Sequence, residues 1–296
     1  MDSLIQLCLL YPGVFYTLVF IVSLMVGSFL NVVIYRLPIM MERDWQQEYN
    51  SYFGDDTSTS EALTDEAPFN LVKPDSTCPK CGHRIRAWEN IPIISYLLLR
   101  GRCASCQTPI SLRYPMVELL TAIVATLVAA HFGPSVAALI AVVVVYILVA
   151  LLFIDLDKML LPDPLTLSLL WLGLIVSTAN VFVDTTSAIL GATFGYLSLW
   201  SVYWLFKLIT GKEGMGYGDF KLLAALGAFT GWQGLPVIIL MSSLVGALAG
   251  IAIMFIQNKG KSLAIPFGPY LAVAGLLTLL YKAPIIDTYL KWITGT

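Results

Sequence analysis

The sequence predicts an all-α polytopic membrane protein with about eight transmembrane helices. Of its 296 residues, 58% are hydrophobic and only 12% are charged, a composition outside the range of soluble globular domains. Apolar runs close to the ~20 residues that cross a bilayer recur along most of the chain. Residues 36–113 form the one long polar stretch, and they contain four of the five cysteines.

The apolar runs define the expected transmembrane helices, of which the sixth is short and rich in glycine. They lie at 12–35, 115–132, 135–154, 164–183, 186–208, 220–234, 235–256 and 265–281. The first is long enough to remain as an anchor, so we expect no cleavable signal peptide. The predicted parts are a first transmembrane helix within 1–35, a cytoplasmic loop over 36–113 and a membrane-embedded bundle over 114–296.

The distribution of Lys and Arg orients these helices, because cytoplasmic loops retain positive charge. Nine of the 17 basic residues lie between the first two apolar runs, and none precedes Tyr11. The N-terminus is therefore expected outside. If the eight runs then cross the membrane in alternating directions, only Lys282 and Lys291 among the basic residues lie outside. The same threading places Asp155, at the end of the third run, and Asp219, at the start of the sixth, on the cytoplasmic face.

The cytoplasmic loop divides into two halves. Residues 41–76 are polar and acidic, with Asp55, Asp56 and Glu61 near the centre, and we expect them to be poorly ordered. The run from Trp88 to Arg102 is apolar but too short to span, so it is expected to lie against the membrane or the helix bundle.

Two C-x-x-C pairs in this loop indicate a metal site. Cys78 and Cys81 are separated from Cys103 and Cys106 by 21 residues, close to zinc-ribbon spacing. In a reducing cytoplasm, thiolates bind metal more readily than they form disulfides, so we expect a zinc-binding knuckle of four sulfurs. Redox disulfides and free thiols are the alternatives. His83 is expected to be a solvated loop residue and not a further ligand.

The glycine-rich sequence GMGYGDFK at 214–221 brings Asp219 to the start of an apolar helix. Placing an ionisable residue at membrane depth costs free energy, so such a residue beside a membrane-spanning segment indicates by default a functional site with a partner group. Glycine at 214, 216 and 218 lets backbone approach closely and bend where the helix begins. The alternative is that Asp219 only caps the helix, a role that suits aspartate.

Three acids compete to be the partner of Asp219. Asp163 lies between two prolines, as in a loop or a helix cap, and Asp157 is adjacent to Lys158 and is expected to face water. Asp155 is nearest to the apolar end of its run, so burial would desolvate its carboxylate the most. We therefore select Asp155 as the partner of Asp219. A calcium loop built from these acids would lack its central glycine.

Two carboxylates held together can share a proton and activate water, which is the chemistry of an aspartic protease. No H-E-x-x-H motif competes, and His83 and His131 are the only histidines. A second hypothesis is a transporter or channel in which Asp155 and Asp219 relay protons or bind a cation. A third is a structural assembly factor. No basic patch exceeds what membrane orientation needs, so no nucleic-acid partner is expected.

With these motifs the chain resembles the bacterial type IV prepilin peptidases, the leader peptidase and N-methyltransferase family of A24-type GxGD aspartic membrane proteases. The resemblance covers nearly the whole chain. Beyond the two acid motifs and the cysteine pairs, it rests on segments at 27–38, 89–92, 113–118 and 266–269.

The resemblance implies catalytic roles for Asp155 and Asp219 and zinc ligation by the four cysteines. It further implies a bacterial inner-membrane enzyme that removes a short basic leader from type IV prepilins and type II secretion pseudopilins after a glycine. The exposed amine, usually of phenylalanine, is then methylated from S-adenosylmethionine. No Rossmann-type glycine motif follows a strand, so methylation rests on resemblance alone and no residue is assigned to the methyl donor. Expected partners are these substrates and membrane lipid.

Overall fold

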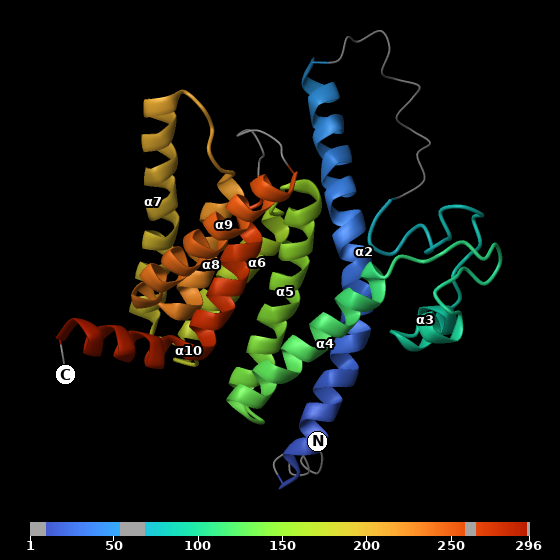
Figure 1. Cartoon of the computed structure of the whole chain (residues 1–296), viewed down its shortest axis with the longest axis horizontal. Coiled ribbons are helices and arrows are strands. Elements are labelled where there is room, and N and C mark those ends of the chain that lie inside the picture. The colour runs from blue at the N-terminus through green and yellow to red at the C-terminus, as the bar shows by residue number, and fades with distance from the viewer. Residues whose placement is uncertain (1–9, 54–68, 258–264, 295–296) are drawn as a thin grey trace. The chain divides into compact units, whose positions relative to one another are not determined.

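The computed structural model describes residues 10–53, 69–257 and 265–294 (Figure 1). Within these ranges the protein is helical, and its only extended pairings are isolated bridges between Thr77 and Arg84 and between Arg102 and Pro109. The chain divides into two compact units, residues 1–127 and 128–296. The predicted all-α membrane fold is confirmed.

Unit 1 is built on two long helices, α2 (Pro12–Phe53) and α4 (Arg113–Phe132). They pack closely where α2 carries Gly27, since a Cβ there would lie 2.8 Å from the Cα of Glu118. One turn further along α2, the Asn31 side-chain amide donates a hydrogen bond to the Tyr114 carbonyl at 3.2 Å. Between these helices the chain forms η1 (Ala87–Asn90), α3 (Ile94–Leu98) and the cysteine-containing loops.

Helix α2 continues well beyond its apolar run. Its 42 residues extend about 63 Å, roughly twice the hydrocarbon thickness of a bilayer. The extension is held by contacts with the returning chain: Arg36 Nη1 donates to the Asn70 carbonyl at 3.0 Å, and the Arg43 guanidinium lies 4.5 Å from the Phe69 ring centroid.

The expectation of poor order over 41–76 is therefore wrong for 41–53, which are helical. These positions hold no glycine or proline and carry good helix formers such as Met, Glu, Arg and Gln, so the helix can continue past the membrane. Residues Asp55, Asp56 and Glu61 lie outside the described residues.

Unit 2 contains α5 (Val136–Lys158), α6 (Asp163–Ser177), α7 (Thr185–Thr210), α8 (Tyr217–Thr230), α9 (Leu235–Gln257) and α10 (Gly268–Thr294). Helix α8 is its core, because its residues from Leu222 to Thr230 are all buried. Helices α6, α7 and α10 pack around it. Burial by other helices explains why a segment of 14 residues, about 21 Å long, is stable here as an apolar helix.

Small residues let α7 approach α8 at backbone distance. A Cβ on Gly191 would collide with the carbonyl of Gly227, and a Cβ on Gly227 would collide with that of Gly191. At Gly195, the added atom would lie 2.8 Å from the carbonyl oxygen of Leu223. This G-x-x-x-G contact fixes α8 against α7 and with it the position of Asp219.

Each predicted apolar run overlaps a described helix, although the bounds differ: α2 ends 18 residues after its run, at Phe53, and α6 ends at Ser177, six residues before the end of its run. Within the described residues, five helices are long and apolar enough to cross a membrane: α2, α4, α5, α7 and the segment Trp232–Phe255, which combines η2 (Trp232–Gly234) with most of α9. Helix α6, with 15 residues, is apolar but shorter. Five candidate spans are thus found among the described residues by length and composition, and a total of eight stays a prediction.

Candidate active site and metal centre

The two acids singled out in the sequence come together at one end of unit 2. Asp155 lies in the last turn of α5 and is 4% exposed, while Asp219 lies in the first turn of α8 and is 7% exposed. They are close enough for the charge of Asp155 to act directly on Asp219. A buried, mutually repelling pair of carboxylates is destabilising unless one of them holds a proton.

Asp155 is fixed by backbone groups on both sides. The N–H of Gly268, the first residue of α10, donates to Asp155 Oδ2 at 2.9 Å. Helix α5 ends at Met159, whose left-handed backbone (φ 51°) directs its N–H to the Asp155 carbonyl at 2.9 Å. The start of α10 thereby orients the carboxylate at the end of α5.

The glycine-rich turn positions Asp219. Gly216 occupies the N-cap of α8, so Asp219 lies inside the first turn and is not the cap residue. A Cβ on Gly218 would lie 2.7 Å from Cβ of Leu161, which shows that α8 begins in direct backbone contact with the α5–α6 connection. Glycine at 218 is therefore needed for the close approach of the two acid-bearing segments.

The two competing acids are placed differently. Asp157 is exposed on the last turn of α5. Asp163, at the first position of α6, is half-exposed and accepts from Lys221 Nζ through both carboxylate oxygens, at 2.6 and 2.7 Å. The buried pair is therefore Asp155 with Asp219, and the ion pair of Asp163 with Lys221 ties the start of α6 to the start of α8.

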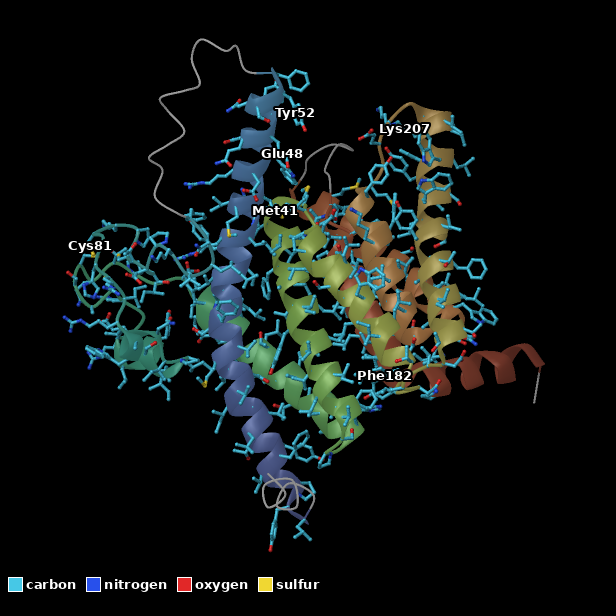
Figure 2. The ribbon with its side chains drawn as sticks, turned by 180° about the vertical axis from the view of Figure 1, so that it is seen from behind. Met41, Glu48, Tyr52, Cys81, Phe182 and Lys207 are labelled. Carbon is cyan, nitrogen blue, oxygen red and sulfur yellow. The ribbon has the colours of Figure 1, made fainter. Side chains whose placement is uncertain are left out.

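A second ion pair restrains the glycine-rich turn from α7. Lys207 Nζ donates to Glu213 Oε1 at 2.9 Å and to the Tyr203 hydroxyl at 3.2 Å (Lys207 is labelled in Figure 2). Tyr203 packs in turn on the rings of Tyr217 and Phe220, with centroid distances of 5.3 and 5.7 Å. The side chains at the beginning of α8 are thus fixed by aromatic packing.

Sequence reasoning did not find the roles of Gly268, Lys221 or Asp163 in this arrangement. Gly268 had been noted only within the 266–269 segment of the family resemblance, and Asp163 only as a loop or cap residue. The D-F-K sequence, which places Lys221 two residues after Asp219, was the available signal for a cation near the acids.

The four cysteines of unit 1 form one cluster, and Figure 2 shows Cys81 among the irregular loops of that unit. All four Sγ atoms lie within 4.8 Å of one another. A tetrahedral site with Zn–S bonds of about 2.3 Å requires sulfurs about 3.8 Å apart. The Sγ atoms of Cys78 and Cys106 are 3.8 Å apart, and those of Cys81 and Cys103 are 3.9 Å apart. The cluster can therefore hold a metal ion.

The two cysteine pairs sit on two copies of the same backbone turn. The N–H of Cys78 donates to the His83 carbonyl and that of Cys103 to the Thr108 carbonyl, both at 2.9 Å. In each copy the residue after the second cysteine has positive φ, 71° at Gly82 and 56° at Gln107. The repeated turn presents each pair of sulfurs to the common centre, as in knuckles that bind zinc.

Local donors favour the thiolate form, which metal binding needs, at Cys78 and Cys106. At Cys81 the backbone N–H of His83 acts in the same direction, but burial and the neighbouring cysteine side chains outweigh it and raise the pKa to about 11. Hydrogen bonds from the side chain and backbone of Thr108 lower the pKa of Cys106 to about 6. Backbone N–H groups of Cys81 and Lys80 lower the pKa of Cys78. His83, two residues after Cys81, contacts Glu89 through Nε2 at 3.2 Å. It is thus paired with a carboxylate, and the cluster consists of the four cysteines.

Comparisons with known proteins agree with this architecture. Residues 21–132 match the bacterial peptidase A24 N-terminal domain, and residues 142–251 match the type IV leader peptidase family. A protein from Aeromonas hydrophila named prepilin leader peptidase/N-methyltransferase is 57% identical over 98% of this chain and 99% of its own. Relatives of the same name from Pseudomonas aeruginosa and Legionella pneumophila are 52% and 45% identical, each over 95% of this chain and 96% of theirs. No solved structure matches the chain.

Proposed function

Because the chain belongs to the type IV leader peptidase family, we propose that it is a prepilin leader peptidase and N-methyltransferase. Its substrates are type IV prepilins and type II secretion pseudopilins, and its peptidase centre is the pair Asp155 and Asp219. The observation that carries the assignment of the centre is that these two carboxylates, from separate helices, are buried together at one end of unit 2.

In the proposed reaction one proton is shared between the two acids. The ionised carboxylate takes a proton from water as the water oxygen attacks the scissile carbonyl carbon, and the protonated carboxyl donates to the carbonyl oxygen. The tetrahedral intermediate then collapses: the C–N bond breaks, the leaving amine takes the proton held by the first acid, and the second acid takes back a proton from one hydroxyl of the intermediate as the new carboxyl group forms. The Gly268 N–H holds Asp155 in place throughout, and packing of Gly218 on Leu161 keeps Asp219 within reach.

The proposed location is the bacterial inner membrane, with the N-terminus outside and the acids at the cytoplasmic face. The distribution of Lys and Arg supports this orientation, and the five candidate spans support membrane residence. A prepilin holds its basic leader inside and its apolar helix in the bilayer. A peptidase for that junction therefore needs acids at the inner face.

Zinc is the proposed metal of the four-cysteine cluster. An all-thiolate tetrahedral set favours zinc over harder cations, and a closed site without a water position is structural. Cys78, Cys81, Cys103 and Cys106 would hold it, and it would stabilise the two turns of unit 1. The peptidase reaction makes no use of it.

S-adenosylmethionine is the proposed methyl donor, on the strength of the name that the relatives share. The described residues contain only isolated bridges and no strand, so they do not fit a Rossmann-type donor site. We derive no step of methyl transfer and assign no residue to the donor.

The decisive experiment is cleavage of a prepilin with a Gly-Phe junction by the full-length protein in liposomes, read by mass. We expect the wild type to remove the leader, while Asp155→Asn and Asp219→Asn express normally and do not. Asp157→Asn is the matched control from the same helix turn and should cleave. Normal cleavage by either of the first two variants would overturn the dyad. Proton or cation flux without cleavage in the wild type would favour the transporter hypothesis instead.

A further inference from the structure

The segment from Trp88 to Leu98 exposes an unusual number of apolar side chains for a loop outside the long helices. Trp88 is 61% exposed, Ile91 42%, Ile94 55%, Leu97 68% and Leu98 77%. They come from η1, the turn at 91–93 and α3, so residues 88–98, here called the apolar loop, present several apolar side chains at the surface. A surface of this kind in contact with water would promote association, and in a native protein it marks an interaction site.

Backbone N–H groups in the turn and in α3 donate to carbonyls of the apolar loop itself. Ile94 N–H donates to Pro92 O, Ser95 to Ile91 O and Leu97 to Ile93 O. The chain that follows α3 is also hydrogen-bonded locally. The N–H groups of Leu99, Arg100, Gly101 and Arg102 all donate to carbonyls of residues 95–99. Internal pairing of this kind is what a hydrocarbon environment requires and what a water-exposed loop does not need.

One donor in the turn is satisfied from outside the loop. Ile93 has a positive φ (φ 60°, ψ −47°), which is costly for a β-branched residue, and its N–H donates to Glu118 Oε2 of α4 at 2.8 Å. Glu118 is 7% exposed. The buried carboxylate thus compensates an N–H that the turn does not pair with its own carbonyls, and it anchors the loop to α4, a candidate membrane span.

This anchor sets the depth of the loop. Helix α4 has 20 residues and is about 30 Å long, which matches the thickness of the hydrocarbon layer, so an upright crossing places Arg113, at its start, at the boundary of that layer. Glu118 lies five residues further in, at a depth of about 7 Å. Ile93, hydrogen-bonded to it, lies at a similar depth, and α3 begins at the next residue.

Arginines flank the apolar loop on both sides. Arg86 precedes it and Arg100 and Arg102 follow it, all with exposed side chains. The Arg86 guanidinium lies 5.1 Å from the Trp88 ring centroid. Arginine on both sides of an apolar segment, with tryptophan on one side, is typical of a membrane interface, where the guanidinium groups can pair with anionic lipid headgroups.

We propose that the apolar loop is inserted into the cytoplasmic leaflet, with Ile94, Leu97 and Leu98 among the acyl chains and the flanking arginines at anionic headgroups. The partner is the lipid bilayer itself. Unit 1 is then attached to the membrane at a third point besides α2 and α4, which holds the cysteine cluster close to the bilayer surface.

The test uses the full-length protein in vesicles of phosphatidylcholine and phosphatidylglycerol, with or without bromine on the acyl chains. Leu98→Trp adds a fluorophore at the most exposed apolar position of the apolar loop, and Lys80→Trp adds one outside that loop, between Cys78 and Cys81. Emission of the wild type is subtracted from each. Metal content, equal to that of the wild type, verifies that each variant is folded, and Leu97→Trp replaces Leu98→Trp if it is not.

The added emission of Leu98→Trp should fall about twofold or more with brominated lipid and be insensitive to iodide, as expected for a side chain within the acyl region. The added emission of Lys80→Trp should show the reverse. Quenching of Leu98→Trp by iodide would place the loop in water and overturn the proposal. Insensitivity to both quenchers would mean that protein covers the loop, which overturns it as well. Neither result depends on cleavage activity.

Discussion

The backbone N–H of Gly268 donates a hydrogen bond to Asp155 Oδ2 at 2.9 Å, joining the first residue of α10 to the last turn of α5. Asp155 is 4% exposed, and this is the hydrogen bond that the structure gives its carboxylate. A carboxylate held in this way cannot turn away from Asp219 without leaving a buried donor unpaired, which costs about 1–3 kcal/mol.

Substitution of Gly268 should therefore impair the peptidase while leaving the protein folded. In Gly268→Ala, the new Cβ would lie 2.6 Å from Asp155 Oδ2 and 3.0 Å from Leu161 Cδ2, so the carboxylate must shift. We expect the cleavage rate to fall about tenfold or more, a loss of about 1.4 kcal/mol of transition-state stabilisation. Liposome cleavage assays at saturating prepilin measure it.

The control for this substitution is Gly13→Ala, where the added Cβ meets nothing within 4 Å. It should cleave at the wild-type rate. If Gly268→Ala matched it, the hydrogen bond to Asp155 would have no part in positioning the acid.

The ion pair of Asp163 with Lys221 should be important for geometry and of little value for stability. Its side chains are 51% and 27% exposed, and pairs of this kind contribute about 0–1 kcal/mol. We expect Asp163→Asn and Lys221→Met each to reduce the cleavage rate a few fold with nearly unchanged thermal unfolding. Exchanging the charges in Asp163→Lys with Lys221→Asp should restore part of the rate.

A complete loss of cleavage in Asp163→Asn, unrelieved by the charge exchange, would contradict this role. It would instead place Asp163 in the reaction, as a competitor of Asp155 for the proton. Rates and unfolding temperatures measured on the same preparations distinguish the two cases.

The sequence was sufficient to predict the elements whose cause is local. Apolar runs located the helices because length and hydropathy decide membrane insertion. Cysteine spacing predicted the four-cysteine cluster because knuckle geometry is set within a few residues. The buried acids were found through the same local logic, since Asp155 and Asp219 both adjoin apolar helix ends. The catalytic assignment itself stays a prediction.

What the sequence could not predict depends on contacts between distant segments. Helix α2 runs on to Phe53, beyond the expected span, and its Arg36 and Arg43 contact Phe69 and Asn70, which follow much later in the chain. The hydrogen bond from Gly268 to Asp155 and the ion pair between Asp163 and Lys221 likewise join segments that no periodicity relates. Positions such as these are decided by tertiary packing.

Removal of one cysteine should release the metal. Cys78→Ser and Cys106→Ser each delete one of four sulfurs, and a structural zinc site depends on its full ligand set. We expect wild-type protein to contain about one zinc per chain by plasma mass spectrometry, and each variant to contain far less and to be cut faster by protease in the loop. Ser105→Ala, between Cys103 and Cys106, should retain the metal. Wild-type protein without zinc would contradict the identity of the metal.

Packing of α7 on α8 should be the feature of unit 2 most sensitive to a single methyl group. Gly191 and Gly227 each face the other's backbone carbonyl, and backbone cannot move aside as a flexible side chain can. Gly227→Ala should therefore separate the helices, costing about 1–3 kcal/mol or more by overpacking and lowering the unfolding temperature in detergent.

The matched control is Gly246→Ala in α9, whose Cβ would approach the Tyr270 ring at 3.2 Å, a contact that a small ring movement relieves. Because α8 carries Asp219, Gly227→Ala should also lose cleavage in proportion to its loss of folded protein. Equal stability of the two variants would show that the α7–α8 contact is looser than the structure indicates.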